Sequence, residues 1–126
     1  MKYLCLAYEE ELKLNRLSPD EWDALRRETL DYVQALQESG HLLTAEPLQS
    51  VETAVTVRIR GGKLSLTDGP FAETKEQLGG LFLIDAKDLN EAIHIASKWP
   101  SARFGSIEVR PVESELRAEG RYAPLA

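Results

Sequence analysis

The segment Asp68-Gly69-Pro70-Phe71 contains the residue types and spacing best suited to chemistry in this sequence. Asp68 follows a run of alternating residues and precedes a Gly-Pro turn, where a carboxylate can point into a cleft. A carboxyl group that is partly desolvated and close to a substrate proton acts as a general acid or base. In the alternative interpretation, the Asp68 carboxylate accepts backbone N–H groups and fixes the loop, as aspartate often does in turns. Asp68 is therefore the candidate catalytic residue, with both interpretations open.

The three residues after Asp68 are candidates for contacts with a ligand. Gly69 and Pro70 shape the turn, because glycine accepts positive φ and proline fixes φ. Phe71 either fills a gap in the core or offers an aromatic face to a ligand. The sequence thus predicts a shaped loop with one aromatic side chain beside the candidate carboxylate.

Four charged residues complete the candidate ligand-binding set. Glu73 and Lys75 follow the loop, and Lys75 can hold an anionic group. Arg58 and Arg110 lie on the polar faces of predicted strands, where a guanidinium can bind a carboxylate bidentately. The competing interpretations are a solvated helix start for Glu73 and Lys75, and a cross-strand ion pair between Glu108 and a neighbouring arginine.

The histidines and the single cysteine give little support for other chemistry. His41 and His94 have no partner at metal-ligand spacing, so no metal site is expected. Cys5 is expected to be a small core residue in a reducing cytoplasm. The sequence contains no P-loop, no dinucleotide-binding fingerprint and no Gly-x-Ser-x-Gly motif, so no cofactor is expected.

Composition indicates a soluble globular protein of one domain. The chain has 126 residues, of which 43% are apolar and 29% are charged. Its net charge of −6 does not fit a nucleic-acid partner, which requires a basic face. The apolar run from Tyr3 to Tyr8 is too short for a signal peptide or a membrane span. We therefore expect a cytoplasmic protein with neither a nucleic-acid nor a membrane partner.

Hydrophobic patterning and turn signals predict six strands and two helices. Ser18-Pro19 starts a helix, with Glu21 placed for a capping box, and Gly61-Gly62 marks a hairpin turn. A further capping box between Thr74 and Gln77 predicts one short helical turn. The predicted strands are 2–8, 41–45, 53–60, 63–67, 81–84 and 107–110. The first predicted helix spans 19–39. The second is capped by Asp88, ends before Trp99-Pro100 and has an apolar stripe of Leu89, Ala92, Ile93 and Ala96.

Without the hairpin, the order of elements is βαββαβ, the ferredoxin-like α+β arrangement. Two helices can cover only one face of the sheet, yet strands 2–8 and 81–84 are apolar on both faces. A stable monomer rarely exposes such a face, so we predict a homodimer in which two sheets pack together. The predicted domain spans 1–113, and 114–126 form a C-terminal arm.

Several segments resemble the DGPF branch of the YCII-related family. They are Asp68 to Glu76, the Leu78 to Asp85 segment after it, the opening Met1-Lys2-Tyr3-Leu4 and Ser106 to Val112. The resemblance runs from residue 1 to residue 113 and implies a dimeric α+β barrel of ferredoxin-like protomers. It also implies an association of some members with extracytoplasmic-function sigma factors, and enzymatic activity in a few relatives, including a dehydrochlorinase acting on a chlorinated aromatic. In the wider family a first-helix histidine pairs with an aspartate; this chain has no histidine in 19–39, and Asp68 matches the aspartate alone.

Two functions stay open on this evidence. The first is a homodimer that binds a small ligand or acts in regulation, with a sigma-factor-linked protein as a further expected partner. The second is a small cofactor-free enzyme of the hydrolase, lyase or isomerase class that uses Asp68 as acid or base in a pocket between protomers. The sequence does not decide whether the protein is an enzyme.

Overall fold

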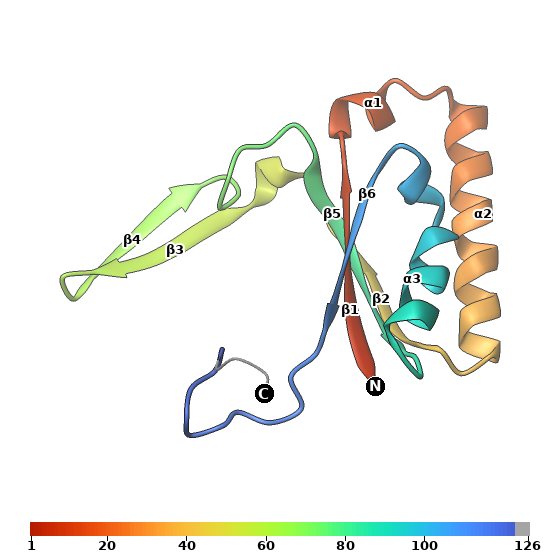
Figure 1. Cartoon of the computed structure of the whole chain (residues 1–126). Coiled ribbons are helices and arrows are strands. Elements are labelled where there is room, and N and C mark those ends of the chain that lie inside the picture. Colours follow the sequence, from red (N-terminus) through yellow and green to blue (C-terminus); the bar gives the residue numbers. More distant parts are fainter. Residues whose placement is uncertain (123–126) are drawn as a thin grey trace.

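The computed structural model describes residues 1–122, and its centre is a four-stranded antiparallel sheet. The sheet has the order β2-β5-β1-β6 and consists of β2 (Leu42–Pro47), β5 (Gln77–Asp85), β1 (Lys2–Glu9) and β6 (Gly105–Pro111). Helices α2 (Pro19–Glu38) and α3 (Leu89–Ser97) cover one face, and the short helix α1 (Glu11–Asn15) follows β1 (Figure 1). The predicted ferredoxin-like α+β fold is confirmed.

The hydrophobic core lies between the sheet and its two helices. Alternation along β1 buries Tyr3, Cys5 and Ala7 on the helix side of the sheet. On the neighbouring strand, Phe82 is fully buried and stacks on Trp99, with ring centroids 3.9 Å apart and planes at 9°. This aromatic pair anchors the chain that leaves α3 against the centre of the sheet.

Both predicted helix starts are confirmed by their caps. Ser18 accepts the N–H of Glu21, and the Glu21 side chain accepts the N–H of Ser18, which completes the predicted capping box. Asp88 caps α3 by accepting the N–H of Glu91. The predicted apolar stripe of α3 was only half right. Leu89 and Ile93 are about half exposed, and the buried positions are Ala92, Ile95 and Ala96, which α3 packs into the core.

The predicted hairpin forms a separate two-stranded sheet of β3 (Val55–Arg60) and β4 (Lys63–Asp68), preceded by the 3-10 turn η1 (Val51–Thr53). Gly61 and Gly62 both have positive φ, as the tight turn requires. The hairpin projects from the sheet on the side away from the helices (Figure 1). One of its faces is apolar and exposed, with fractional exposures from 55% to 66% at Val55, Val57, Ile59, Leu64 and Leu66.

The sheet face opposite α2 and α3 is uncovered within residues 1–122 (Figure 1). It presents Leu4 and Leu6 from β1, which pair with Leu83 and Leu81 of β5. These leucines are partly exposed. The sheet is therefore apolar on both faces, as the sequence predicts.

Two local predictions were wrong or incomplete. No helix forms after Thr74, because Gln77 already belongs to β5, and its side chain accepts the N–H of Glu11 at 3.1 Å. The strand predicted from residue 81 begins at Gln77 for the same reason.

Helix α1 was not predicted. The predicted C-terminal arm lies outside any helix or strand up to residue 122, and its last residues, 123–126, lie outside the described part.

No helix within residues 1–122 combines the length and apolar character that a membrane crossing requires.

Candidate functional site

The loop after Asp68 is fixed to the base of the hairpin by its backbone. Gly69 donates its N–H to the carbonyl of Ala54 at 2.7 Å, and the Thr56 hydroxyl donates to the carbonyl of Gly69 at 2.9 Å. Gly69 has φ of 112°, a conformation that glycine adopts without strain. Gly69 and Pro70 are only partly exposed, whereas Asp68 is exposed. The loop is thus held in place without help from the Asp68 carboxylate.

Arg58 and Phe71 lie together beside this loop. The Arg58 guanidinium carbon lies 5.9 Å from the centroid of the Phe71 ring, a cation–π distance. Phe71 is 82% exposed, so it does not fill the core of the single chain. The two side chains place a positive charge beside an exposed aromatic ring at the base of the hairpin.

The end of the same segment returns to the sheet at a junction with β1, α1 and β6. Lys75 Nζ lies 3.5 Å from Glu10 Oε1. The Ser106 hydroxyl donates to the Glu76 carboxylate at 2.7 Å. Glu73, between the loop and this junction, is exposed. Lys75 therefore contacts the residue that joins β1 to α1.

Arg110 lies elsewhere, on the last strand β6. Its guanidinium pairs with Glu108, which is two residues away on the same face of the strand. The predicted ion pair of Glu108 with an arginine is present, but it lies within β6, so its cross-strand form was wrong. The predicted site residues therefore occupy three places in the described chain: the hairpin base, the junction and β6.

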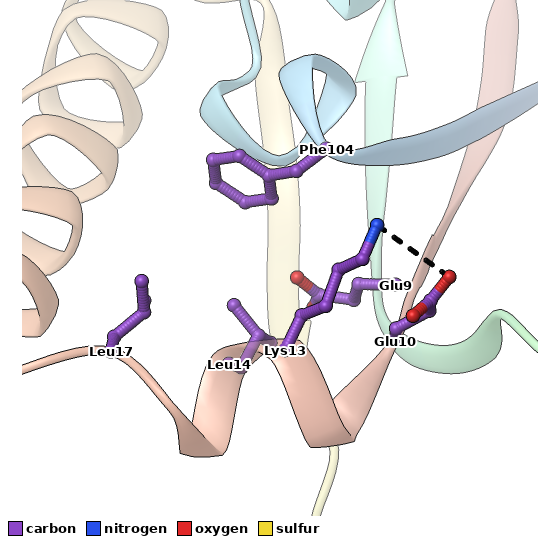
Figure 2. A pocket seen from close by; sticks show the side chains of 6 residues that line it. All are labelled: Glu9, Glu10, Lys13, Leu14, Leu17 and Phe104. Atoms are coloured by element: carbon purple, nitrogen blue, oxygen red, sulfur yellow. Dashed lines mark ion pairs between the residues drawn. The ribbon is translucent and has the colours of Figure 1, made fainter.

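A hollow of about 190 Å³ lies at the junction (Figure 2). Its apolar walls are Leu14, Leu17 and Phe104; its charged lining residues are Glu9, Glu10 and Lys13. Glu9 ends β1, and α1 brings Lys13 and Leu14. Phe104 follows the 3-10 turn η2 (Pro100–Arg103). The hollow thus exists because the short helix α1 turns the chain back beside the end of the sheet.

Glu9 is held between two glycines of neighbouring strands. A Cβ at Gly79 would lie 2.5 Å from Glu9 Oε1, and a Cβ at Gly105 would lie 2.0 Å from the carbonyl oxygen of Tyr8. Only glycine permits these close approaches. The two glycines let β5 and β6 close around the end of β1 and leave room for the Glu9 side chain.

The surroundings of Glu9 disfavour its charged form. Burial raises the pKa of the Glu9 carboxyl above its ordinary value, and the negative charge of Glu11 raises it further. Glu11 itself accepts the Val51 N–H and the Ser50 hydroxyl, each at 2.8 Å. In the described part of the chain Glu9 has no ion pair, whereas Glu10 pairs with both Lys13 and Lys75. Such a carboxyl can exchange a proton with a ligand or pair with a ligand cation.

Sequence reasoning missed Glu9. The available signal was the change from the apolar strand to the acidic run Glu9-Glu10-Glu11. In the structure Gly105 pairs with Glu9, and Gly79 lies against the Glu9 side chain. The burial of Glu9 depends on Phe104 and on both glycines, which are distant in sequence. Short-range patterning does not reveal such contacts.

Other groups offer little chemistry. Burial raises the pKa of the Cys5 thiol to about 12, which makes it a poor nucleophile. A second, more open hollow between α3 and β6 has no titratable side chain in its lining. Across residues 1–122, no three histidine, cysteine, aspartate or glutamate side chains gather as metal ligands.

Comparison with known proteins places this arrangement in a family. The family model described as the YCII-related domain matches residues 1–115. An uncharacterised protein, R00369 of Rhizobium meliloti (strain 1021), is 37% identical over 114 residues, covering 89% of this chain and 92% of that protein. A similar solved structure is that of 5-chloro-2-hydroxyhydroquinone dehydrochlorinase from Burkholderia phenoliruptrix AC1100, in complex with 2,5-dihydroxybenzoquinone. The two chains superpose with a TM-score of 0.53 at 14% sequence identity, and the match covers 90% of this chain and 94% of that one. This likeness supports the fold. The chain belongs to the YCII-related family.

Proposed function

We propose that this protein binds a small organic molecule in the hollow beside Glu9 and works as a homodimer. The observation that carries the proposal is the lining of the hollow, in which three apolar side chains lie beside the charged residues Glu9, Glu10 and Lys13, and Glu9 is partly buried. Ligand sites commonly combine apolar walls with a few placed polar groups. An apolar cavity of about 150 Å³ holds benzene, so a hollow of about 190 Å³ fits a molecule with a single ring.

The homodimer is supported by the apolar surface left uncovered. Leu4, Leu6, Leu81 and Leu83 lie on the open sheet face, and the hairpin adds a second apolar face. Figure 1 shows the hairpin projecting on the same side as the open sheet face, so a second copy seated against that face would lie beside the hairpin as well. Large exposed apolar patches mark interaction surfaces, and a two-fold pair is the commonest way to cover one.

The second candidate function is a small cofactor-free enzyme of the hydrolase, lyase or isomerase class. The dehydrochlorinase among the similar solved structures favours it. Asp68, the candidate acid or base, is exposed in the single chain. Catalysis by Asp68 therefore requires the partner copy to cover it. A sigma-factor-linked partner and a cytoplasmic location remain proposals, the latter supported by the free, buried Cys5.

A thermal-unfolding screen with a library of single-ring compounds tests the ligand site. A ligand that binds only the folded protein raises its melting temperature. Leu17→Trp fills the hollow, and Leu12→Trp is the matched control, because Leu12 lies on α1 and is exposed. Compounds that stabilise wild type and Leu12→Trp but not Leu17→Trp support the proposal. Hits that survive Leu17→Trp and vanish in Asp68→Asn contradict it and favour the enzyme at the Asp68 loop.

A further inference from the structure

We propose that the ligand of this hollow is a small organic ammonium ion, whose charge pairs with Glu9 and whose apolar body contacts Phe104, Leu14 and Leu17. The inference rests on the proposed function and names the class of molecule that the hollow takes. It follows from the charges, the lining and the size of the hollow.

The lysines nearest the hollow pair with Glu10 and leave Glu9 without a cation. Two carboxylates, Glu9 and Glu10, line it against a single ammonium group, that of Lys13. Lys13 lies 3.7 Å from Glu10, and Lys75 approaches the same Glu10 oxygen at 3.5 Å. Both nearby lysines thus serve Glu10. Within residues 1–122 the Glu9 carboxylate has no cationic partner of its own.

The lining suits a cation with an apolar body. In Figure 2 the Glu9 side chain lies beneath the ring of Phe104, between Leu14 and Glu10. An aromatic ring attracts an ammonium group through its quadrupole, and the leucines offer apolar contact to the rest of the molecule. The net charge of −6 adds a long-range attraction for cations.

Other ligand classes fit less well. A carboxylate ligand would face Glu9 and Glu10, and the nearby cations, Lys13 and Lys75, already pair with Glu10. A neutral alcohol could donate a hydrogen bond to Glu9 but would bring no opposite charge to its carboxylate. A bound ammonium ion opposes the raised Glu9 pKa, because an opposite charge favours the carboxylate form, which burial and the charge of Glu11 disfavour.

Three probes with one ring and different head groups test the inference: benzylamine, benzyl alcohol and benzoate. Their affinities are measured by titration calorimetry on the full chain at neutral pH, where benzylamine is protonated. We expect benzylamine to bind on the order of tenfold more tightly than benzyl alcohol, because only its ammonium group adds an opposite charge to the hydrogen bond with the carboxylate. Benzoate is expected to bind more weakly than both.

Glu9→Gln keeps the shape of the side chain and removes its charge. It should lower the benzylamine affinity by on the order of tenfold and leave that for benzyl alcohol nearly unchanged. The control Glu38→Gln, at the exposed end of α2, should change neither affinity. Thermal melts of both variants establish that they are folded.

The outcomes separate this inference from the proposed function. If benzylamine and benzyl alcohol bind equally and Leu17→Trp abolishes both, the ammonium class is wrong and the small-molecule site stands. If benzylamine does not bind wild type, or binds Glu9→Gln equally well, the inference is overturned. Whether the hollow binds any compound is decided separately by the Leu17→Trp comparison in the thermal screen.

Discussion

The carboxyl of Glu9 lies over Gly79, where the absence of a side chain leaves the space that the carboxyl occupies. A Cβ at this position would approach Glu9 Oε1 to 2.5 Å and the Glu9 Cγ to 3.1 Å. This relationship joins the end of β1 to the start of β5 and determines where the carboxyl can lie. The predictions below begin from it.

Gly79→Ala should displace the Glu9 side chain with little loss of stability. The atom nearest to the new methyl group belongs to the end of a side chain that can move. Gly105→Ala is the contrasting variant, because its Cβ would overlap the backbone oxygen of Tyr8 at 2.0 Å. We expect Gly105→Ala to cost about 1–3 kcal/mol, as overpacking does. Urea unfolding measures both variants, and equal losses would contradict the arrangement around Glu9.

Glu9→Gln should stabilise the free protein at neutral pH. Because the pKa of Glu9 is raised on folding, the folded state retains its proton to a higher pH than the unfolded state. Stability attributable to Glu9 is therefore greatest below the pKa of the unfolded chain and falls as the pH rises through the raised folded pKa. The uncharged variant escapes this loss, so its advantage should shrink as the pH falls. Urea unfolding across acidic and neutral pH measures it, and a pH-independent difference would contradict the cause assigned here.

Phe82→Ala should be the most damaging of the simple core substitutions. Phe82 is fully buried and stacks on Trp99. Truncating a buried phenylalanine to alanine costs about 3–5 kcal/mol. Leu12→Ala, at an exposed position of α1, is the control and should lie within about 0.5 kcal/mol of wild type. A Phe82→Ala loss no larger than that of the control would show that the described core is wrong.

Leu6→Glu should separate the proposed homodimer into monomers. It places a charge in the middle of the open sheet face, where burial without a partner is costly, and it leaves the helix side of the sheet unchanged. Sedimentation at micromolar concentration should give a dimer for wild type and a monomer for the variant. A well-folded wild-type monomer under these conditions would refute the dimer but would leave the hollow intact, because its lining residues all come from one chain.

The sequence predicts those parts of the fold that depend on local signals. The Ser18-Pro19 cap with Glu21, the Gly61-Gly62 turn and the alternation of 2–8 act over a few residues, and all three features are present. Helix α1 has only five residues, too few for a helix to be stable by itself. Its first N–H group is bound by the side chain of Gln77, 66 residues away. Gln77 is also the first residue of β5, so a strand begins at the position where a short helical turn was predicted.

For a similar reason, the sequence predicted Lys75 beside the candidate site but missed Glu9. Lys75 was selected for its charge, and the structure places it on Glu10 at the junction. Glu9 becomes a distinctive carboxyl only after Gly79, Phe104 and Gly105 arrive from distant strands and turns. The charge of a residue is visible in the sequence, but its burial depends on these long-range contacts.

The most direct test of the site is a carboxyl-detected NMR titration of Glu9 in protein labelled with ¹³C at glutamate, with and without benzylamine. In the free protein the Glu9 carboxyl should titrate above the range of the exposed glutamates, because it is partly buried and faces Glu11. Saturating benzylamine should lower its pKa, since a bound ammonium ion favours the carboxylate. A Glu9 resonance that titrates identically in both samples would contradict the assignment of this hollow as the ligand site for an amine.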